Sequence, residues 1–425
     1  MLSLGVAVTS PVPPDFATPR DQHLFGPGPK RILALSGGGV RGALTVAFLK
    51  RLEEILDARH GFEVRLGDHF DLIGGTSTGA LIAGALALGY RVDQIKTFYT
   101  EHAELAFQPR HWQLPVLQSK FDSHGLREQI ASVIGERELG TPDLITGFCC
   151  ITKRLDTGSV WMISNNPRAH YWEDGPDYIG NKHYSLANLV RASTAAPHYF
   201  DPEMLPITGL ALPKLAEDLS LFAALLAEGA ELLQTRRPAK EGDDGDLSQY
   251  GLFVDGGVSP YNNPSLALLQ LATLKAHGIQ WPMGPDQLSI TSIGTGSYRP
   301  RLAVNSLGMG RVPKLAFHAL LSMMADAEKQ ALTLLQWLGE TPQPWLIDSE
   351  IGTLAGDGPP GGKAFRFHCY DVRLEEDWLR DELGSDADAL EVAALRRMDD
   401  PAIARSIYAI GEVAAKRQIR PEDWA

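Results

Sequence analysis

The sequence has few cysteines and no long apolar run. Its 425 residues include three cysteines, and Cys149 and Cys150 lie together in the mostly apolar run 145–151. We therefore expect buried, reduced thiols and no disulfide framework. The longest apolar run, 80–88, holds nine residues, whereas a membrane-spanning helix needs roughly 20. These counts argue against a transmembrane segment.

Basic charge is also scarce, since the formal net charge is −13 at pH 7. This charge argues against a nucleic-acid partner and against general adsorption to an anionic membrane. The N-terminus has no basic region ahead of its apolar start, so no signal peptide is expected. We expect a cytoplasmic protein that is able to contact a membrane peripherally, with export by a route lacking a classical signal left open. Metal-binding motifs such as H-E-x-x-H, paired C-x-x-C and the EF-hand loop are missing, so we expect no metal and no cofactor.

The first third of the chain alternates strands, glycine turns and helices. A strand at 31–35 is followed by glycines and a helical pattern at 42–58; a second strand at 70–73 leads through glycines to a helix at 80–88. This order predicts an α/β fold with a mainly parallel sheet covered by helices on both faces. Further strands are expected at 146–152, 160–164, 252–254, 288–293 and 365–372.

Composition and local patterns divide the whole chain into segments. Residues 1–29 are rich in proline and glycine and predict an irregular arm, while 30–300 forms the main α/β domain. The segment 202–250 is an expected insertion, whose helical run at 212–233 has an apolar stripe facing either the core or a lipid surface. Residues 301–425 are expected to form a helical region, with helices near 314–338 and 386–416, packed on the same unit.

The sequence Gly-Thr-Ser-Thr-Gly at 75–79 lies between the second strand and its helix. A reactive serine must project from a sharp turn, and Gly75 and Gly79 would relieve crowding around Ser77. The helix that follows would also direct the positive end of its dipole toward the serine. The alternative is a tight turn that carries an ordinary serine.

A second glycine-rich segment, Gly37-Gly38-Gly39-Val40-Arg41-Gly42, follows the first strand. Its exposed amide groups would suit an anion, either a bound phosphate or a transient oxyanion. It also fits the G-x-G-x-x-G pattern of dinucleotide-binding proteins. In such a unit the next strand would end in an acidic residue; here that strand opens into the serine turn, which favours the oxyanion interpretation.

A third motif, Asp255-Gly256-Gly257, ends the apolar strand at 252–254. This is where α/β folds place catalytic groups. The alternative is a structural Asx turn or helix cap.

Together these motifs resemble the patatin family of lipid acyl hydrolases. Three further stretches, ASTAAPHYF at 192–200, NNP at 262–264 and SIGTG at 292–296, also look like the family and occur in its order. The resemblance implies a three-layer α/β/α fold. It also implies a phospholipase A-type hydrolase that cleaves acyl esters at a membrane or micelle, with or without an activator.

The resemblance further implies roles for individual residues. Ser77 would be the nucleophile and Asp255 its base, without a histidine, and the backbone of Gly37, Gly38 and Gly39 would form the oxyanion hole. Arg41 would brace this loop or meet the lipid headgroup, unless it is an ordinary surface or salt-bridge residue. The supporting glycines would be Gly42, Gly75, Gly79, Gly256 and Gly257.

Other interpretations stay open from the sequence. His318 and His368 follow Asp255, as a conventional triad requires, but neither lies in a glycine-flanked loop just after a strand. His198 lies in a family-like stretch but precedes Asp255. We expect all three histidines to be structural. The rival functions are a nucleotide-binding protein that uses the 37–42 loop, and a catalytically silent interaction module on the same scaffold.

Overall fold

The computed structural model describes residues 16–101, 104, 120–121, 123–208, 249–300 and 312–424. The helix expected at 212–233 lies outside these residues. The strands are β1 (Lys30–Leu35), β2 (Leu72–Thr76), β3 (Gly147–Arg154), β4 (Val160–Ser164), β5 (Glu203–Pro206), β6 (Tyr250–Asp255), β7 (Leu288–Ile293), β8 (Gly339–Glu340) and β9 (Phe365–Tyr370). The helices are α1 (Pro19–Phe25), α2 (Gly42–His60), α3 (Leu66–His69), α4 (Thr78–Ala87), α5 (Val92–Glu101), α7 (Ser123–Ile134), α8 (Leu186–Ser193), α10 (Ser265–Thr273), α11 (Val312–Leu338), α12 (Glu376–Leu383), α13 (Ala389–Leu395) and α14 (Ala404–Gln418).

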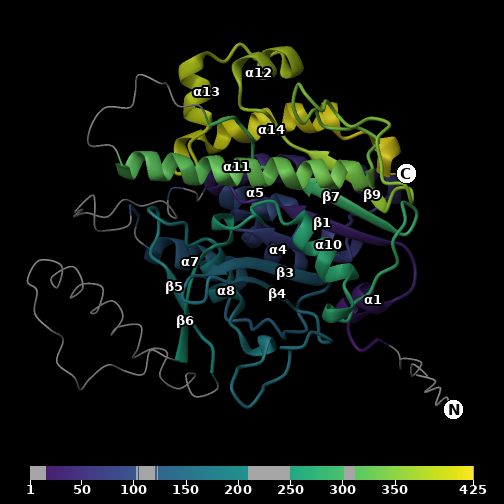
Figure 1. The fold of residues 1–425 in the computed structure, drawn as a ribbon, viewed down its shortest axis with the longest axis vertical. Coiled ribbons are helices and arrows are strands. Elements are labelled where there is room, and N and C mark those ends of the chain that lie inside the picture. The colour runs from purple at the N-terminus through teal and green to yellow at the C-terminus, as the bar shows by residue number, and fades with distance from the viewer. Residues whose placement is uncertain are drawn as a thin grey trace, which may run out of the picture.

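The described strands form one sheet in the order β5-β6-β3-β2-β1-β7-β9-β8, and β4 also pairs with β3 (Figure 1). Six neighbouring strands of this order are parallel to one another, namely β3, β2, β1, β7, β9 and β8. The strands β4, β5 and β6 are added by antiparallel pairing. The predicted mainly parallel sheet is therefore confirmed, with an antiparallel edge.

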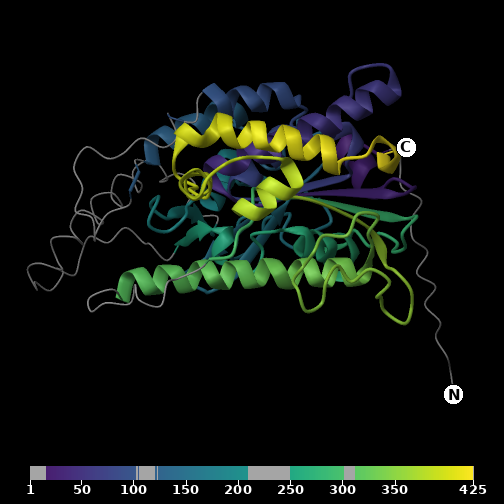
Figure 2. The same ribbon diagram turned by 90° about the horizontal axis from the view of Figure 1, so that it is seen from above.

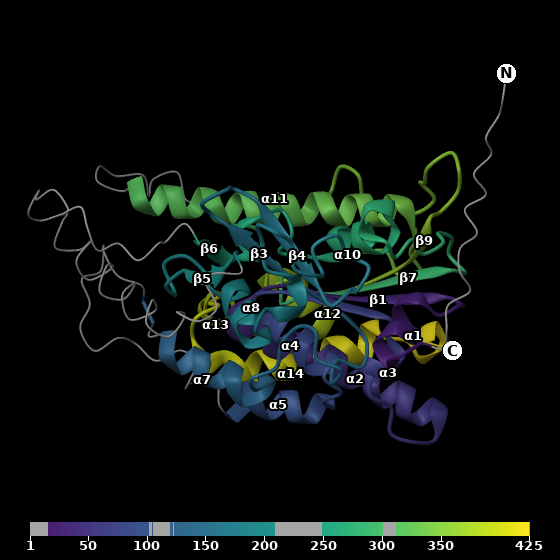
Figure 3. The same cartoon turned by 90° about the horizontal axis from the view of Figure 1, so that it is seen from below.

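Helices cover both faces of this sheet, which confirms the three-layer architecture. Figure 3 shows α10 and α11 on one face and α2, α4, α5 and α14 on the other, and Figure 2 shows α11 and α14 on opposite sides. One apolar core includes Phe48, Leu86 and Phe148. A second core, beneath α10 and α11, includes Leu268 and Phe367.

Several boundaries differ from the sequence-based predictions. The arm expected to be irregular over 1–29 contains α1, which begins after Thr18, whose hydroxyl accepts a hydrogen bond from the Asp21 amide at 3.2 Å. The strand β2 continues through Gly74 and Gly75, which were expected to form the turn. A side chain at Gly74 would meet the Leu268 methyl at 2.4 Å, so the glycine allows α10 to pack closely on the strand. The strand β5 lies within the segment expected to be an insertion.

The C-terminal part of the chain contributes strands as well as helices. The strand β9 pairs with β7 from Arg366 to Tyr370 and extends the sheet beyond the first 300 residues. The helix α14 packs on α2, where a side chain at Gly411 would lie 2.7 Å from the Ala47 methyl. As predicted, the helical pattern near the C-terminus is interrupted at Pro401. No helix in the described ranges combines the length and apolar character needed to cross a bilayer.

Candidate active site

Ser77 lies at the junction between β2 and α4 in a backbone conformation that is rare for serine. Its φ of 56° and ψ of −127° form a sharp turn, and the residue caps the N-terminus of α4. A side chain at Gly75 would meet the Gly79 backbone at 2.1 Å, and one at Gly79 would meet the Leu35 carbonyl oxygen at 2.2 Å. The two flanking glycines are therefore required by close backbone approach. The turn leaves Ser77 partly exposed in a cavity.

The glycine-rich loop after β1 reaches the same cavity. A side chain at Gly37 would lie 3.0 Å from the Ser77 methylene carbon. The amide of Gly37 donates to the Asn262 carbonyl at 3.2 Å, whereas the amides of Gly38 and Gly39 have no acceptor among the described residues. Two of the three amides are thus free to bind a negatively charged oxygen.

The sheet register brings Asp255 next to Ser77. In the parallel pair of β2 and β3, Thr76 lies opposite Ile151; in the antiparallel pair of β3 and β6, Thr152 lies opposite Asp255. Ser77 follows Thr76, so it lies level with Thr152 of β3 and therefore with Asp255 on the other side of that strand. The Ser77 hydroxyl lies near enough to the Asp255 carboxyl to lower its pKa. The aspartate reaches this edge on an antiparallel strand, a direction that the sequence analysis did not predict.

Asp255 is only 5% exposed. This burial raises its pKa to about 6, against opposing contributions from the Ser77 hydroxyl, the Gly257 amide and the Arg191 guanidinium. The Gly257 amide donates to Oδ1 at 2.7 Å, which fixes the orientation of the carboxylate. At neutral pH the carboxylate is mainly ionised, and it is a stronger base than an exposed aspartate.

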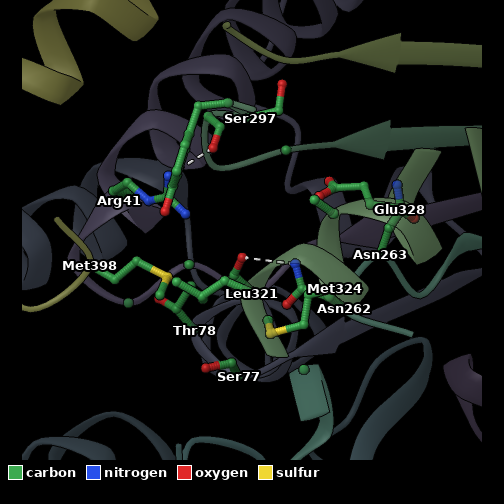
Figure 4. Close-up of a pocket in the computed structure, with 18 of the residues that line it drawn as sticks. Arg41, Ser77, Thr78, Asn262, Asn263, Ser297, Leu321, Met324, Glu328 and Met398 are labelled. Atoms are coloured by element: carbon green, nitrogen blue, oxygen red, sulfur yellow. Dashed lines mark hydrogen bonds between the residues drawn. The ribbon is translucent and has the colours of Figure 1, made fainter. Parts of the chain in front are cut away.

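The cavity has a volume of about 640 Å³, and its walls include the glycine loop, Ser77 and Asp255. Figure 4 shows Ser77, Asn262 and Met324 around it. No histidine is among the described residues that line it. His368 lies elsewhere on β9, and burial lowers its pKa to about 4, while His318 contacts Ser322 on α11. The geometry therefore gives Ser77 a carboxylate partner and no imidazole in the cavity.

Arg41 is buried rather than exposed, which excludes a plain surface role. It is 5% exposed, and its Nη1 donates to the Gly296 carbonyl at 2.9 Å, bracing the segment after β7. Its guanidinium lies 5.6 Å from the centre of the Tyr298 ring. Among the described residues, Arg41 forms no ion pair, and its Nε has no hydrogen-bond partner. Burial lowers the pKa of this side chain.

Three polar residues that support this geometry were not assigned a role from the sequence. Ser193 Oγ accepts a hydrogen bond from the Ser77 amide at 2.8 Å and donates to the Ile151 carbonyl at 2.6 Å. Thr295 and Asn262 both donate to the Gly37 carbonyl, at 2.9 and 3.4 Å. All three lie in the secondary stretches at 192–200, 262–264 and 292–296, so the signal was present although the contacts were not predictable.

The remaining glycines of the motifs lie at close contacts. Gly42 begins α2, where a side chain would meet the Thr78 hydroxyl at 2.6 Å. Gly256 follows Asp255, where a side chain would meet the Ile151 carbonyl at 2.3 Å. Across the ranges that the structure describes, no group of three or more His, Cys, Asp or Glu side chains is placed to hold a metal ion. Cys149 and Cys150 are buried free thiols, as predicted.

The chain is similar to known proteins over part of its length. The cGAMP-activated phospholipase of Escherichia coli strain TW11681 is 32% identical over 178 residues, which cover 40% of this chain and 48% of that protein. Patatin-like protein 2 of Arabidopsis thaliana is 25% identical over 299 residues, covering 65% of this chain and 62% of that protein. The chain thus spans about half to three fifths of the length of these relatives.

A structural comparison finds human GIVD cytosolic phospholipase A2, with 12% identity, a TM-score of 0.38 and coverage of 93% of this chain and 60% of that one. A family model described as patatin-like phospholipase matches residues 33–269. This range is more than half of the 425 residues and contains the glycine loop, the serine turn and the aspartate motif. The chain therefore belongs to the patatin-like phospholipase family.

Proposed function

We propose that this chain hydrolyses fatty acyl esters of phospholipids or related lipids through a Ser77–Asp255 dyad and an acyl-enzyme intermediate. The observation that carries the proposal is the convergence in one cavity of a strained serine, a buried carboxylate with a raised pKa, and two unoccupied backbone amides. A positioned nucleophile, base and oxyanion donor are what acyl transfer requires.

Acylation would proceed in two steps. Ser77 Oγ attacks the ester carbonyl carbon while its proton passes to the Asp255 carboxylate. The carbonyl oxygen becomes an oxyanion that accepts hydrogen bonds from the amides of Gly38 and Gly39. The intermediate then collapses and breaks the carbon–oxygen bond to the leaving group, which takes the proton from Asp255 and departs as the alcohol or lyso-lipid.

Deacylation would repeat these steps with water. Asp255 removes a proton from water as its oxygen attacks the acyl carbon, and the same amides stabilise the second oxyanion. Collapse releases the fatty acid and returns the proton to Ser77 Oγ. Because the Gly37 amide is already bonded to Asn262, we assign the oxyanion hole to Gly38 and Gly39, with Gly37 as a structural member of the loop.

Labelling with a fluorophosphonate probe tests this function, because the probe reacts covalently with an activated serine. We expect labelling of the wild type and turnover of a p-nitrophenyl ester. We expect Ser77→Ala to abolish labelling and reduce turnover at least about 10³-fold. Ser132→Ala, which changes an exposed serine on α7, serves as the control. Labelling that persists in Ser77→Ala would refute the assignment, and absence of turnover in the wild type would favour the silent module.

Activation by a ligand is a separate proposal. It rests on the similarity to proteins named as cGAMP-activated phospholipases. We infer that turnover rises when an activator binds, and assays of the full chain with and without cGAMP test the simplest case. A nucleotide that binds to the Ser77→Ala variant, and that does not change ester turnover by the wild type, would instead support the nucleotide-binding alternative.

A further inference from the structure

The cavity that contains Ser77 continues to a polar end beneath α11. Arg41 contributes to this end from the loop after β1, Glu328 from α11, and Asp371 from the segment after β9. Figure 4 shows Arg41 and Glu328 on opposite sides of the cavity, with the ends of both side chains directed into it. Glu328 and Asp371 lie outside the range 33–269 that matches the family, so the shared motifs do not account for them.

Arg41 and Glu328 carry opposite charges but do not pair with each other. No ion pair joins them within 4.0 Å, and neither has another ion-pair partner among the described residues. Arg41 Nη1 is held by Gly296, while its Nε is buried without a partner. The buried Nε is closed off from the cavity, so a ligand would meet the rest of the guanidinium, whose only hydrogen-bond acceptor among the described residues is the Gly296 carbonyl. The geometry therefore indicates that an anionic group of the ligand lies beside Arg41.

Glu328 is the counterpart on the opposite wall. In the described part of the chain its carboxylate has no hydrogen-bond donor. Burial and the negative charge of Asp371 together raise its pKa to about 7, against the opposing charge of Arg41. Asp371 is itself satisfied, because its Oδ1 accepts from the Gly296 amide at 2.8 Å. Lys329 and Arg373 also line the cavity, but Lys329 pairs with Asp348, so Glu328 is the carboxylate without an ion-pair partner that is available to a cation at this end.

We propose that Glu328 is a specificity-determining residue that binds the ammonium group of a lipid whose phosphate faces Arg41. A headgroup with a phosphate joined to a primary amine would place its two charges against the two walls. The substrates preferred would then be aminoalkyl phospholipids. This inference rests on the proposed lipid hydrolase function, which it deepens by naming the headgroup.

The test compares two lipids with identical acyl chains in mixed micelles with a neutral detergent. Phosphatidylethanolamine carries the ammonium group, and phosphatidylglycerol carries hydroxyl groups instead. For the wild type we expect a higher kcat/KM on phosphatidylethanolamine. Glu328→Gln removes the charge and keeps the shape, and it should reduce the ratio of the two kcat/KM values about tenfold, mainly through KM. Glu328→Asp should restore part of the ratio.

Glu412→Gln, which changes an exposed carboxylate on α14, should leave the ratio unchanged. A wild type that does not prefer the amine lipid would overturn the proposal. So would a Glu328→Gln variant that slows both lipids by the same factor, because that result indicates a structural role.

A binding experiment distinguishes failure of this inference from failure of the proposed hydrolase function. Ser77→Ala is titrated calorimetrically with soluble glycerophosphoethanolamine and glycerophosphoglycerol. We expect tighter binding of the amine, lost in the double variant with Glu328→Gln. If the wild type hydrolyses no lipid but this preference is present, the function fails and the headgroup site stands. Equal binding of the two probes would overturn the site whatever the enzyme hydrolyses.

Discussion

Asp255 shows how burial adapts an ordinary carboxyl group to its proposed task. An exposed aspartate is a weak base for a serine hydroxyl, because it holds a proton only in acid. Burial of this side chain raises its pKa to about 6, nearer to the pH at which general-base catalysis is efficient. The same burial makes both the activity and the stability of the protein depend on pH.

If Asp255 is the base, as proposed, its ionised form is the active one and activity depends on pH. We expect kcat/KM for a soluble p-nitrophenyl ester to be level above about pH 7 and to fall roughly tenfold per pH unit below about pH 6. A pH–rate profile measures this. An acid limb centred near pH 4 would show that the carboxyl group titrates as an exposed aspartate and would contradict the proposed role of its burial.

The stability of the protein should increase when this charge is removed. The pKa of Asp255 is raised by folding, so ionisation opposes folding; this penalty is complete above about pH 6, shrinks below it and vanishes below about pH 3.8, where both states are protonated. A shift of roughly two units corresponds to about 3 kcal/mol. Asp255→Asn should therefore unfold at a higher temperature than the wild type at pH 8, and lose most of this advantage at pH 4.

Thermal melts at the two pH values test this expectation, with Asp386→Asn as the control because Asp386 is exposed. An Asp255→Asn variant that is less stable at pH 8 would contradict it. A more stable but inactive variant would show that this position trades stability for function.

At the scale of elements, the loop between β1 and α2 is held by segments far away in the sequence. Thr295 and Asn262 bind the Gly37 carbonyl, and the Val40 amide donates to the Met398 carbonyl at 2.9 Å. A methyl group at Gly38 would lie 2.1 Å from the Thr295 hydroxyl. Such an overlap would displace the loop and the amides proposed as oxyanion donors.

We therefore expect Gly38→Ala to lower kcat by about 10²-fold or more, the effect typical of losing one oxyanion donor. Gly361→Ala is the matched control, since a methyl group there has no atom within 4 Å. Steady-state kinetics on the p-nitrophenyl ester measure both variants. Unchanged kcat in Gly38→Ala would separate this loop from the chemistry.

The sequence predicted local elements well and long-range arrangements poorly. Both strand-to-helix units near the N-terminus were predicted, because their apolar periodicity is local. The end of β2 was wrong, since Gly74 and Gly75 resemble a turn in sequence but serve close packing in the fold. The support that Ser193 gives to Ser77 was not predictable, because it joins residues 116 positions apart.

At the scale of the whole molecule, the C-terminal region packs on the same sheet as the part of the chain that matches the family. It supplies β9 to the sheet, α11 to the cavity and α14 to the outer face of α2. The region beyond residue 300 therefore contributes to the walls of the cavity. Changes in its packing should affect the glycine loop, which α2 follows directly in the chain.

Gly411→Val tests the contact between α14 and α2. Its side chain would overlap the Ala47 methyl, and the Leu44 carbonyl lies only 3.1 Å from the added carbon. Overpacking of this kind typically lowers stability by about 1–3 kcal/mol. We expect a lower midpoint in urea unfolding, whereas Glu412→Val, on the exposed side of the same helix, should change it little. Equal effects of the two substitutions would refute the close contact.

The antiparallel entry of β6 into the sheet makes the carboxylate sensitive to strand slippage. Successive side chains of a strand point to opposite faces, so a shift of one position between β3 and β6 would turn Asp255 away from Ser77 while most ladder bonds re-formed. Such a misaligned protein would be folded and inert. A single residue added inside β6 would therefore separate the proposed base from the proposed nucleophile even though the sheet itself could still form.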